Sequence, residues 1–286
     1  MPKQRSASVL TACLFFLGTV CLLLLLSRCF AAPTDTADAP PGGGRAIALM
    51  YHHLLPRSEV GRYRGNNIVT YVEDFEAQLR LLQERNCTVI TPDVLEAFFY
   101  DGQPLPERAV LITLDDGYLS NAVYTAPLLR KYGMKAVVFT VTGRLNDSEA
   151  AFNPRYIQML SAAQMRDTAD VLVYASHTHD LHRFVRTGHS ALTDCSSLDF
   201  CSDLESSLAF LQTVPHASLT CFSYPYGLYT EEVKRELAAQ GVRLAFRASG
   251  GVITEAGDPY ALPRYPVDSS VSLQGFERYL SGLTGS

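Results

Sequence analysis

The hydrophobic pattern of residues 46–266 alternates between short apolar runs and longer amphipathic segments. Short β-branched runs are typical of buried strands, and apolar positions three and four apart indicate helices packed on one face. The predicted strands are residues 46–51, 87–90, 109–114, 135–141, 170–175, 219–224 and 243–247. The predicted helices are residues 71–85, 92–100, 121–132, 202–212 and 230–240. Such alternation predicts an α/β domain in which helices wrap a parallel sheet curled into a barrel.

Residues at the ends of several predicted helices favour their initiation or termination. Thr70 and Glu73 have the spacing of a capping box, in which two side chains bond the first free backbone N–H groups. Pro92 would begin its helix at a position that needs no N–H donor. Thr230 and Gly241 bracket the last helix, because threonine caps an amino end and glycine accepts the left-handed backbone beyond the other end.

The N-terminal segment differs in composition from the rest of the chain. Two basic residues precede an uncharged apolar run at 9–26, and small residues follow it. The length of this run suits both an export signal and a single membrane anchor. We predict a signal peptide or anchor at 1–31, a flexible tether at 32–45 and one domain at 46–286. The protein is therefore expected in the periplasm, at the cell surface, or anchored in the membrane through residues 9–26.

The charge of the chain argues against polyanionic partners. Residues 1–31 hold three basic residues and no acid, so the remainder has 21 basic and 29 acidic residues and a formal net charge of −8. A surface of this sign does not favour nucleic acid, and we expect none to bind.

Four cysteines follow the leader, and their pairing stays open from the sequence. They are Cys87, Cys195, Cys201 and Cys221. An even number in an exported chain permits disulfides, and Cys195 and Cys201 are close enough to close a local loop, but four reduced thiols are an equal alternative. Without a CxxC spacing, zinc binding by these cysteines is not expected.

Chemically capable residues follow four of the predicted strands. They are Tyr51-His52-His53, Asp115-Asp116, the segment 176–182 and the segment 224–227. In a parallel barrel all strand carboxyl ends open on one face, so these segments would converge there. Adjacent ionised carboxylates repel one another, which favours a nearby cation, and imidazoles with a carboxylate form a metal site with open coordination positions.

The histidine spacing does not decide which pair would bind a metal. His177 and His182 are five positions apart and would diverge on a helix, whereas His177 and His179 are two apart and would share one side of an extended segment. A structural histidine is the alternative at each position, and an ordinary turn is the alternative for Asp115-Asp116.

Three motifs in this order resemble motifs one to three of the polysaccharide deacetylases, carbohydrate esterase family 4. They are TLDDGY at 113–118, SHTHDLH at 176–182 and SYPYG at 223–227. The histidine spacing is similar to that of the exported poly-N-acetylglucosamine deacetylases, and the likeness covers most of residues 46–266. The resemblance implies a single-domain, distorted (β/α) barrel of about seven parallel strands.

The resemblance also implies a site. One divalent ion, zinc in the first place and otherwise cobalt, nickel or iron, would be bound by Asp116, His177 and His182. Asp115 would be the general base that takes a proton from the attacking water, and the backbone N–H of Tyr226 would stabilise the oxyanion.

Further positions follow from the resemblance or depart from it. Ser223 occupies the place of an arginine that pairs with the base in many relatives. Arg264 could supply that charge from another strand, and a surface ion pair is the alternative. The usual C-terminal histidine is missing, so His52 is the candidate acid for the leaving amine, with a structural histidine as the alternative. Thr178 would steady the histidine loop, and His179 would neighbour the ligands.

The sequence thus predicts a metal-dependent hydrolase that removes N-acetyl groups from an extracytoplasmic aminosugar polymer. Poly-N-acetylglucosamine, peptidoglycan and chitin-like chains are the candidate substrates, in that order. Tyr118, Tyr226 and Tyr229 could present ring faces to sugars, although packing is the stronger explanation for any one of the 15 tyrosines. The alternative is a glycan-binding barrel that has lost turnover with the usual arginine and acid. A glycosidase is a third hypothesis, which adjacent aspartates suit less well.

Overall fold

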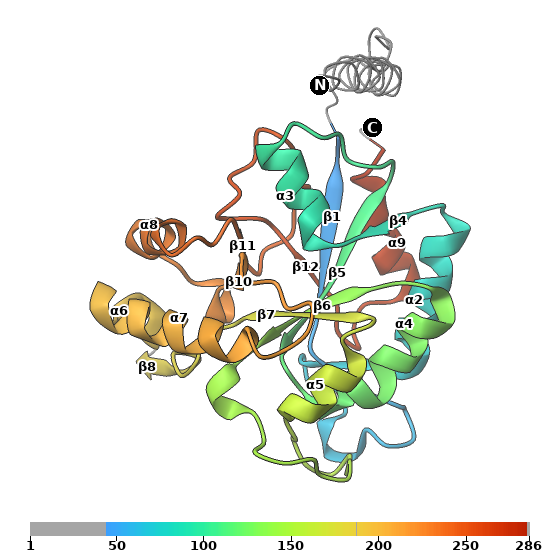
Figure 1. The fold of residues 1–286 in the computed structure, drawn as a ribbon. Coiled ribbons are helices and arrows are strands. Elements are labelled where there is room, and N and C mark those ends of the chain that lie inside the picture. Colours follow the sequence, from blue (N-terminus) through green and yellow to red (C-terminus); the bar gives the residue numbers. More distant parts are fainter. Residues whose placement is uncertain (1–43, 187, 285–286) are drawn as a thin grey trace, which may run out of the picture. The chain divides into compact units, whose positions relative to one another are not determined.

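The computed structural model describes residues 44–186 and 188–284, which contain an eight-stranded sheet (Figure 1). Its strand order is β11-β10-β7-β6-β5-β1-β12, with β4 paired to β5 beside this path, and all pairs are parallel. The strands are β1 (Ala46–Tyr51), β4 (Thr88–Ile90), β5 (Ala109–Asp116), β6 (Ala136–Thr140), β7 (Leu172–Ser176), β10 (Cys221–Ser223), β11 (Leu244–Phe246) and β12 (Tyr265–Pro266).

Strand β5 is central, because three strands pair with it. β1 pairs along residues 109–114, β4 along 109–111 and β6 along 113–116. β1 therefore occupies one edge of β5, and β4 and β6 pair with successive parts of the opposite edge. All eight residues of β5 are buried, as expected for a strand covered on both faces.

The sheet curls, and the segment that contains Leu262 connects its two end strands, β11 and β12. The Leu262 N–H donates to the Ala245 carbonyl and the Arg247 N–H donates to the Leu262 carbonyl, both at 2.9 Å. The chain then continues into β12, which pairs with β1. This closure confirms the predicted distorted (β/α) barrel of about seven parallel strands.

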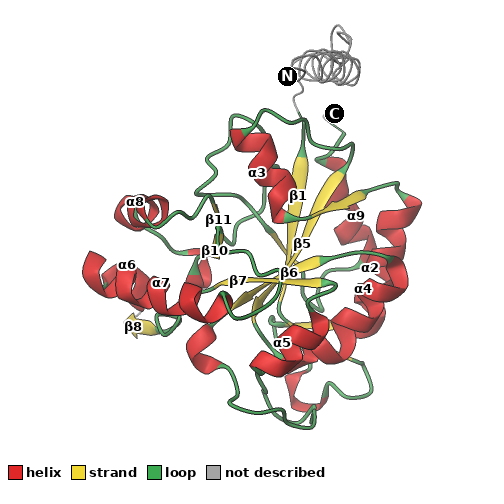
Figure 2. Cartoon of the chain, in the orientation of Figure 1, coloured by secondary structure: helices red, strands yellow, loops and turns green. Residues whose placement is uncertain are grey.

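Helices surround the strands (Figure 2). The helices are α2 (Val72–Glu84), α3 (Pro92–Tyr100), α4 (Ala126–Tyr132), α5 (Ala162–Thr168), α6 (Ala191–Asp194), α7 (Ser197–Leu211), α8 (Glu231–Ala239) and α9 (Leu273–Ser281). α2 contacts α4 and α9 on one side, and α7 contacts α8 on the other (Figure 1). Two small sheets pair β2 (His53–Leu55) with β3 (Val69–Tyr71) and β8 (Phe184–Arg186) with β9 (His189–Ser190).

Each predicted strand and helix is present. The predictions at 46–51 and 92–100 match β1 and α3 at both ends, and most of the others differ from the structure at one or both ends. The helix predicted at 202–212 begins earlier, at Ser197, because the Ser196 side chain accepts a hydrogen bond from the Asp199 N–H. The helix predicted at 121–132 begins as a π-helix, Asn121–Thr125, before it becomes α4. Strands β2, β3, β8, β9 and β12 and helices α5, α6 and α9 have no counterpart in the prediction.

The predicted capping box of α2 is wrong. The Thr70 hydroxyl donates to the Val267 carbonyl at 2.8 Å, and Glu73 accepts from a loop N–H, so both side chains serve tertiary contacts. The predicted cap of α8 is confirmed, since the Thr230 hydroxyl accepts from the Val233 N–H at 3.2 Å.

The predicted leader at 1–31 and almost all of the predicted tether at 32–45 lie outside the described residues. None of the described helices has both the length and the apolar character needed to cross a bilayer. No disulfide forms among the cysteines that the structure describes, which are Cys87, Cys195, Cys201 and Cys221.

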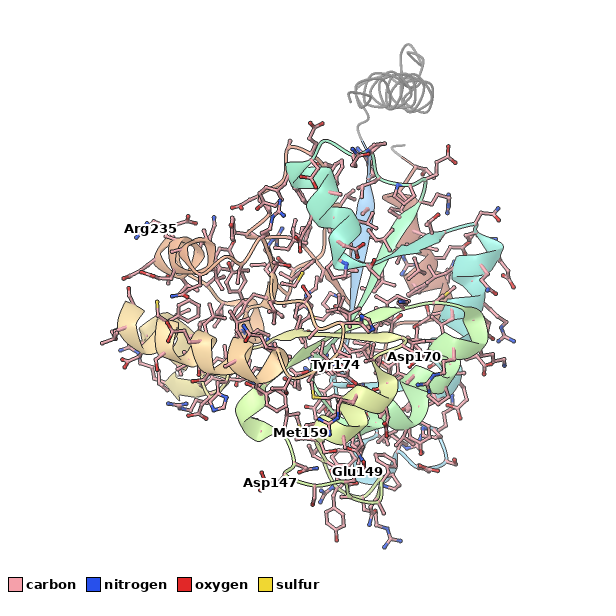
Figure 3. All side chains as sticks on the ribbon, viewed as in Figure 1. Asp147, Glu149, Met159, Asp170, Tyr174 and Arg235 are labelled. Atoms are coloured by element: carbon pink, nitrogen blue, oxygen red, sulfur yellow. The ribbon has the colours of Figure 1, made fainter. Side chains whose placement is uncertain are left out.

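Successive residues of each strand point in turn into the barrel interior and outward to the surrounding helices. On β5, Ala109 and Leu111 belong to the interior apolar cluster, whereas Val110 and Ile112 belong to the cluster that includes side chains of α2, α4 and α9. Figure 3 labels Tyr174 of β7, whose hydroxyl lies 2.7 Å from that of the last residue of α5, and Arg235 at the surface of α8.

Candidate metal centre and active site

The inward-facing positions end in polar residues at the carboxyl end of the barrel. On β5 the inward series ends in Thr113 and Asp115. The same alternation on β1, β7 and β10 leads to His52, His177 and Ser223. Because parallel strands end at a common edge, residues distant in sequence meet there.

A cavity of about 420 Å³ opens over this end of the barrel. Its volume falls within the range of about 300–1,000 Å³ that small-molecule sites occupy. Its polar lining consists of His52, Asn67, Asp115, Asp116, His177, His182, Tyr226 and Asp268, and its apolar lining includes Met50, Ile68, Pro266 and Val267.

Asp116, His177 and His182 converge in this cavity. The Asp116 Oδ1 atom lies 3.2 Å from His182 Nε2 and 3.7 Å from His177 Nε2. One ligand atom from each residue lies within 4.8 Å of the others, so a single cation fits among them. The structure thus brings together the three residues named as metal ligands, and it selects His182 rather than His179 as the partner of His177.

The protonation and burial of this cluster fit a metal ion. Asp116 Oδ1 is buried without a hydrogen-bond partner among the described residues. His177 Nδ1–H donates to the Ser223 carbonyl at 2.7 Å, which leaves the lone pair on Nε2. Burial lowers the pKa of His177 and lowers that of His182 to about 4, so both rings are neutral, the form that binds metals.

A tight turn directs the second aspartate into the cluster. Asp116 has a φ of +74° and Gly117 has a φ of +83°, both in the left-handed region. A Cβ atom on Gly117 would lie 2.9 Å from Cγ2 of Thr140. Glycine is therefore required here, and Asp116 leaves the strand alternation so that Asp115 and Asp116 face different partners.

Asp115 forms a bidentate ion pair with Arg264. Its Oδ1 and Oδ2 accept from Nη1 and Nη2 of Arg264 at 2.6 and 2.7 Å, and the guanidinium also donates to the hydroxyls of Thr113 and Ser223. Burial alone would raise the pKa of Asp115, but Arg264 and His177 hold it well below its usual range. Arg264 is fully buried, so it is not a surface ion pair.

His52, Tyr118 and Tyr226 also lie at the cavity or beside it. His52 lines the wall. Tyr118 is buried next to Asp116, and burial together with that carboxylate raises the pKa of its phenol. The Tyr226 ring is 39% exposed, with its centroid 4.7 Å from that of His182, and its backbone has a φ of +60°.

The neighbouring loop positions differ partly from expectation. Nδ1 of His179 lies 3.0 Å from Oγ1 of Thr142, and the ring stays outside the ligand cluster, as expected. The Thr178 hydroxyl is buried without a partner among residues 44–186 and 188–284, so it does not steady the loop through a hydrogen bond.

Asn67, Arg144 and Asp268 lie at the site but are not among the predicted site residues. Asp268 lines the cavity two residues after β12, a two-residue strand without a hydrophobic signature of its own. Arg144 donates to the backbone carbonyl of His182 and lies 3.4 Å from Nδ1 of that ring. Its position after β6, at the same end of the barrel as the motifs, is the only signal in the sequence.

A family model described as polysaccharide deacetylase matches residues 102–245, half of the chain. The chain belongs to the polysaccharide deacetylase family. The matched residues include Asp115, Asp116, His177, His182 and Tyr226, whereas the family match ends before Arg264.

Named relatives of this polysaccharide deacetylase point to one branch. The poly-beta-1,6-N-acetyl-D-glucosamine N-deacetylase of Staphylococcus aureus strain MRSA252 is 24% identical over 271 residues, which cover 85% of this chain and 90% of the relative. The enzyme of the same name from strain MSSA476 is 25% identical over 233 residues, 77% of each chain.

Solved structures of deacetylases share the fold. IcaB from Ammonifex degensii superposes with a TM-score of 0.70 at 24% identity, over 85% of this chain and 98% of its own. The Streptococcus pyogenes deacetylase PplD, in complex with acetate, also gives 0.70, at 19% identity, over 83% and 99%. As a member of this family, the protein is an enzyme that acts on an acetylated polysaccharide.

Proposed function

We propose that this polysaccharide deacetylase is a metal-dependent enzyme that removes N-acetyl groups from an aminosugar polymer outside the cytoplasm. The convergence of Asp116, His177 and His182 carries the proposal. These three residues would hold one divalent ion, zinc before cobalt, nickel or iron. Such an ion lowers the pKa of water from 15.7 to about 7 and polarises a carbonyl group.

Asp115 would act as the general base. Arg264 keeps its carboxylate ionised and fixes its orientation, and Oδ2 lies 3.9 Å from Nε2 of His177, beside the ligand cluster. The carboxylate would take a proton from water as the water oxygen bonds to the acetamide carbon. The C–N bond then breaks, which yields acetate and an amine on the sugar.

The remaining cavity residues would act on the leaving group and the substrate. His52 would donate a proton to the departing amine, and the backbone N–H of Tyr226 would donate to the oxyanion. Tyr118 would close the pocket beside Asp116, with its hydroxyl protonated at neutral pH.

The favoured substrate is poly-N-acetylglucosamine, followed by peptidoglycan and chitin-like chains. The names of the staphylococcal relatives support the first place of poly-N-acetylglucosamine. The extracytoplasmic location rests on the apolar run at 9–26, which would be removed as a signal or kept as a membrane tether.

The glycan-binding alternative loses one of its two supports. It assumed that the chain lacks both the arginine that pairs with the base and the usual acid, and the buried Arg264 guanidinium contacts both oxygens of Asp115.

Acetate release from β-1,6-linked and β-1,4-linked N-acetylglucosamine oligomers, with and without zinc, tests the proposal. Asp115→Asn should reduce release by about 10²-fold or more, because it removes the proton acceptor and leaves the ligand residues in place. Metal analysis of the purified protein should find about one ion per chain. Oligomer binding without acetate release by the metal-loaded wild type would contradict the proposal.

A further inference from the structure

The loop between His177 and His182 must keep one shape for the two rings to meet. The ring centroids lie 4.7 Å apart, although the residues are five positions apart in sequence. Thr178, directly after His177, has a φ of +75°, a left-handed backbone that is unfavourable for a β-branched residue. Such a conformation persists only where the surroundings fix it.

Asp203 of α7 binds this loop immediately after Thr178. One carboxylate oxygen accepts from the His179 N–H at 2.8 Å and the other from the Asp180 N–H at 2.6 Å. No lysine or arginine within residues 44–186 and 188–284 forms an ion pair with Asp203. Its charge is therefore directed to two consecutive peptide groups of the loop, as charge-assisted hydrogen bonds.

The segment after β6 holds the same peptide groups from the other side. The Thr142 N–H donates to the Thr178 carbonyl at 3.1 Å, and the Gly143 N–H donates to the His179 carbonyl at 2.9 Å. A Cβ atom on Gly143 would lie 2.5 Å from that carbonyl oxygen, so the two segments are in the closest contact that glycine allows. The loop is thus clamped between residues 142–143 and α7.

We propose that Asp203 is a positioning residue of the metal centre, which fixes the loop so that His177 and His182 present Nε2 to the same ion. The proposal rests on the proposed function, in which these histidines bind the metal. Asp203 contacts neither ion nor substrate, so its effect should appear in metal affinity and ligand geometry. Partners that orient metal ligands typically contribute about 10- to 100-fold to affinity.

Asp203→Asn is the direct test. Asparagine keeps the size of the side chain, but its NH₂ group would face one of the two N–H donors, so one hydrogen bond is lost. Glu205→Gln is the matched control, because Glu205 is an exposed acid on the same helix. Zn²⁺ affinity is measured by competition with a chromophoric chelator, and ligand geometry by the visible spectrum of the Co²⁺-loaded protein.

Asp203→Asn should bind Zn²⁺ about 10- to 100-fold more weakly than wild type and alter the Co²⁺ spectrum, while Glu205→Gln changes neither. Acetate release by Asp203→Asn should recover as Zn²⁺ is raised, which loss of a substrate contact would not produce. Wild-type affinity and spectrum in Asp203→Asn overturn the proposal.

A second variant decides the matter if Asp203→Asn does not fold. In Gly143→Ala the added Cβ atom would displace the His179 carbonyl from the side opposite Asp203, so Zn²⁺ binding should weaken in the same way. Unchanged Zn²⁺ affinity would contradict the proposal that the loop conformation determines metal binding. If wild type binds neither metal, the proposed function fails. If wild type binds Zn²⁺ and releases acetate while both variants bind equally well, only the assignment of Asp203 fails.

Discussion

Arg264 is the largest side chain without solvent exposure among the described residues. A buried guanidinium is tolerated because each of its N–H groups has an acceptor. The acceptors are the two carboxylate oxygens of Asp115, the hydroxyls of Thr113 and Ser223, and the Arg247 carbonyl. The same contacts keep Asp115 charged, so stability and the proposed acid–base chemistry depend on one ion pair.

Removing that pair from one side should be costly. Arg264→Met leaves Asp115 buried without its partner and should lower the free energy of unfolding by about 3–5 kcal/mol. The double variant Arg264→Met/Asp115→Asn should recover part of this loss, because no buried charge remains unpaired. Urea unfolding of the three proteins measures both effects, and equal midpoints for wild type and Arg264→Met would contradict the role of the pair.

His53 should make stability depend on pH. Burial lowers its pKa from the ordinary value of 6.5 to about 4, and Nδ1 lies 2.8 Å from the Ser120 hydroxyl. The unfolded chain takes up a proton below pH 6.5 and the folded chain only near pH 4, so stability falls across this interval, by at most about 3 kcal/mol from this residue. His53→Asn should show a shallower fall in urea unfolding between pH 7 and 4. Parallel profiles for the two proteins would refute this.

The alternation within strands accounts for much of the site at the level of elements. The apolar runs predicted all the longer strands, and inward positions on four of them lead to His52, Asp115, His177 and Ser223. The spacing of the histidines could not decide between His179 and His182, because the choice depends on a left-handed Thr178. Nothing in the sequence pattern indicates a role for Asp203, because its hydrogen bonds join a helix to a loop more than twenty residues away.

Short elements escaped prediction for a physical reason. β12 has two residues and α6 has four, so neither presents enough positions for a period to appear. Their places are set by the finished barrel: β12 pairs with β1, and the residue after it, Val267, donates its N–H to the Met50 carbonyl.

The turn after β5 should not accept a side chain at Gly117. Gly117→Ala combines a positive φ with a Cβ atom 2.9 Å from Thr140 Cγ2, whereas Gly102→Ala has a φ of +65° and open space. Both variants should lose about 1 kcal/mol to backbone strain, and Gly117→Ala should lose more and bind Zn²⁺ more weakly, because Asp116 must shift. Thermal unfolding and zinc titration of both variants measure these effects. Equal stability and equal zinc affinity in the two variants would exclude a role for the contact between the added Cβ atom and Thr140.

At the scale of the whole molecule, metal binding and folding should be coupled, because the proposed ligands come from β5 and from the segment after β7. Zinc at about 100 times its dissociation constant should raise the free energy of unfolding by about 2.7 kcal/mol. Asp116→Asn should abolish this gain, and the exposed Asp147→Asn should keep it. Urea unfolding with zinc and with EDTA provides the measurement, and zinc stabilisation of Asp116→Asn would contradict the ligand assignment.

The barrel should not depend on oxidation. The described cysteines are free, and burial raises the pKa of Cys221 to about 12, so this thiol stays protonated and unreactive at neutral pH. A reducing agent should leave the unfolding temperature unchanged, and alkylation of the folded protein should spare Cys221. A lower unfolding temperature in dithiothreitol would reveal a disulfide.

The joining of β11 to β12 through Leu262 has a consequence for the timing of activity. All three proposed metal ligands precede residue 183, but the guanidinium that pairs with the proposed base, Asp115, belongs to the last strand-forming segment. A growing polypeptide whose residue 264 is still inside the ribosome therefore contains all three proposed ligands but lacks the arginine that pairs with Asp115. Under the proposed function, amide hydrolysis would begin only once the C-terminal stretch has emerged and docked.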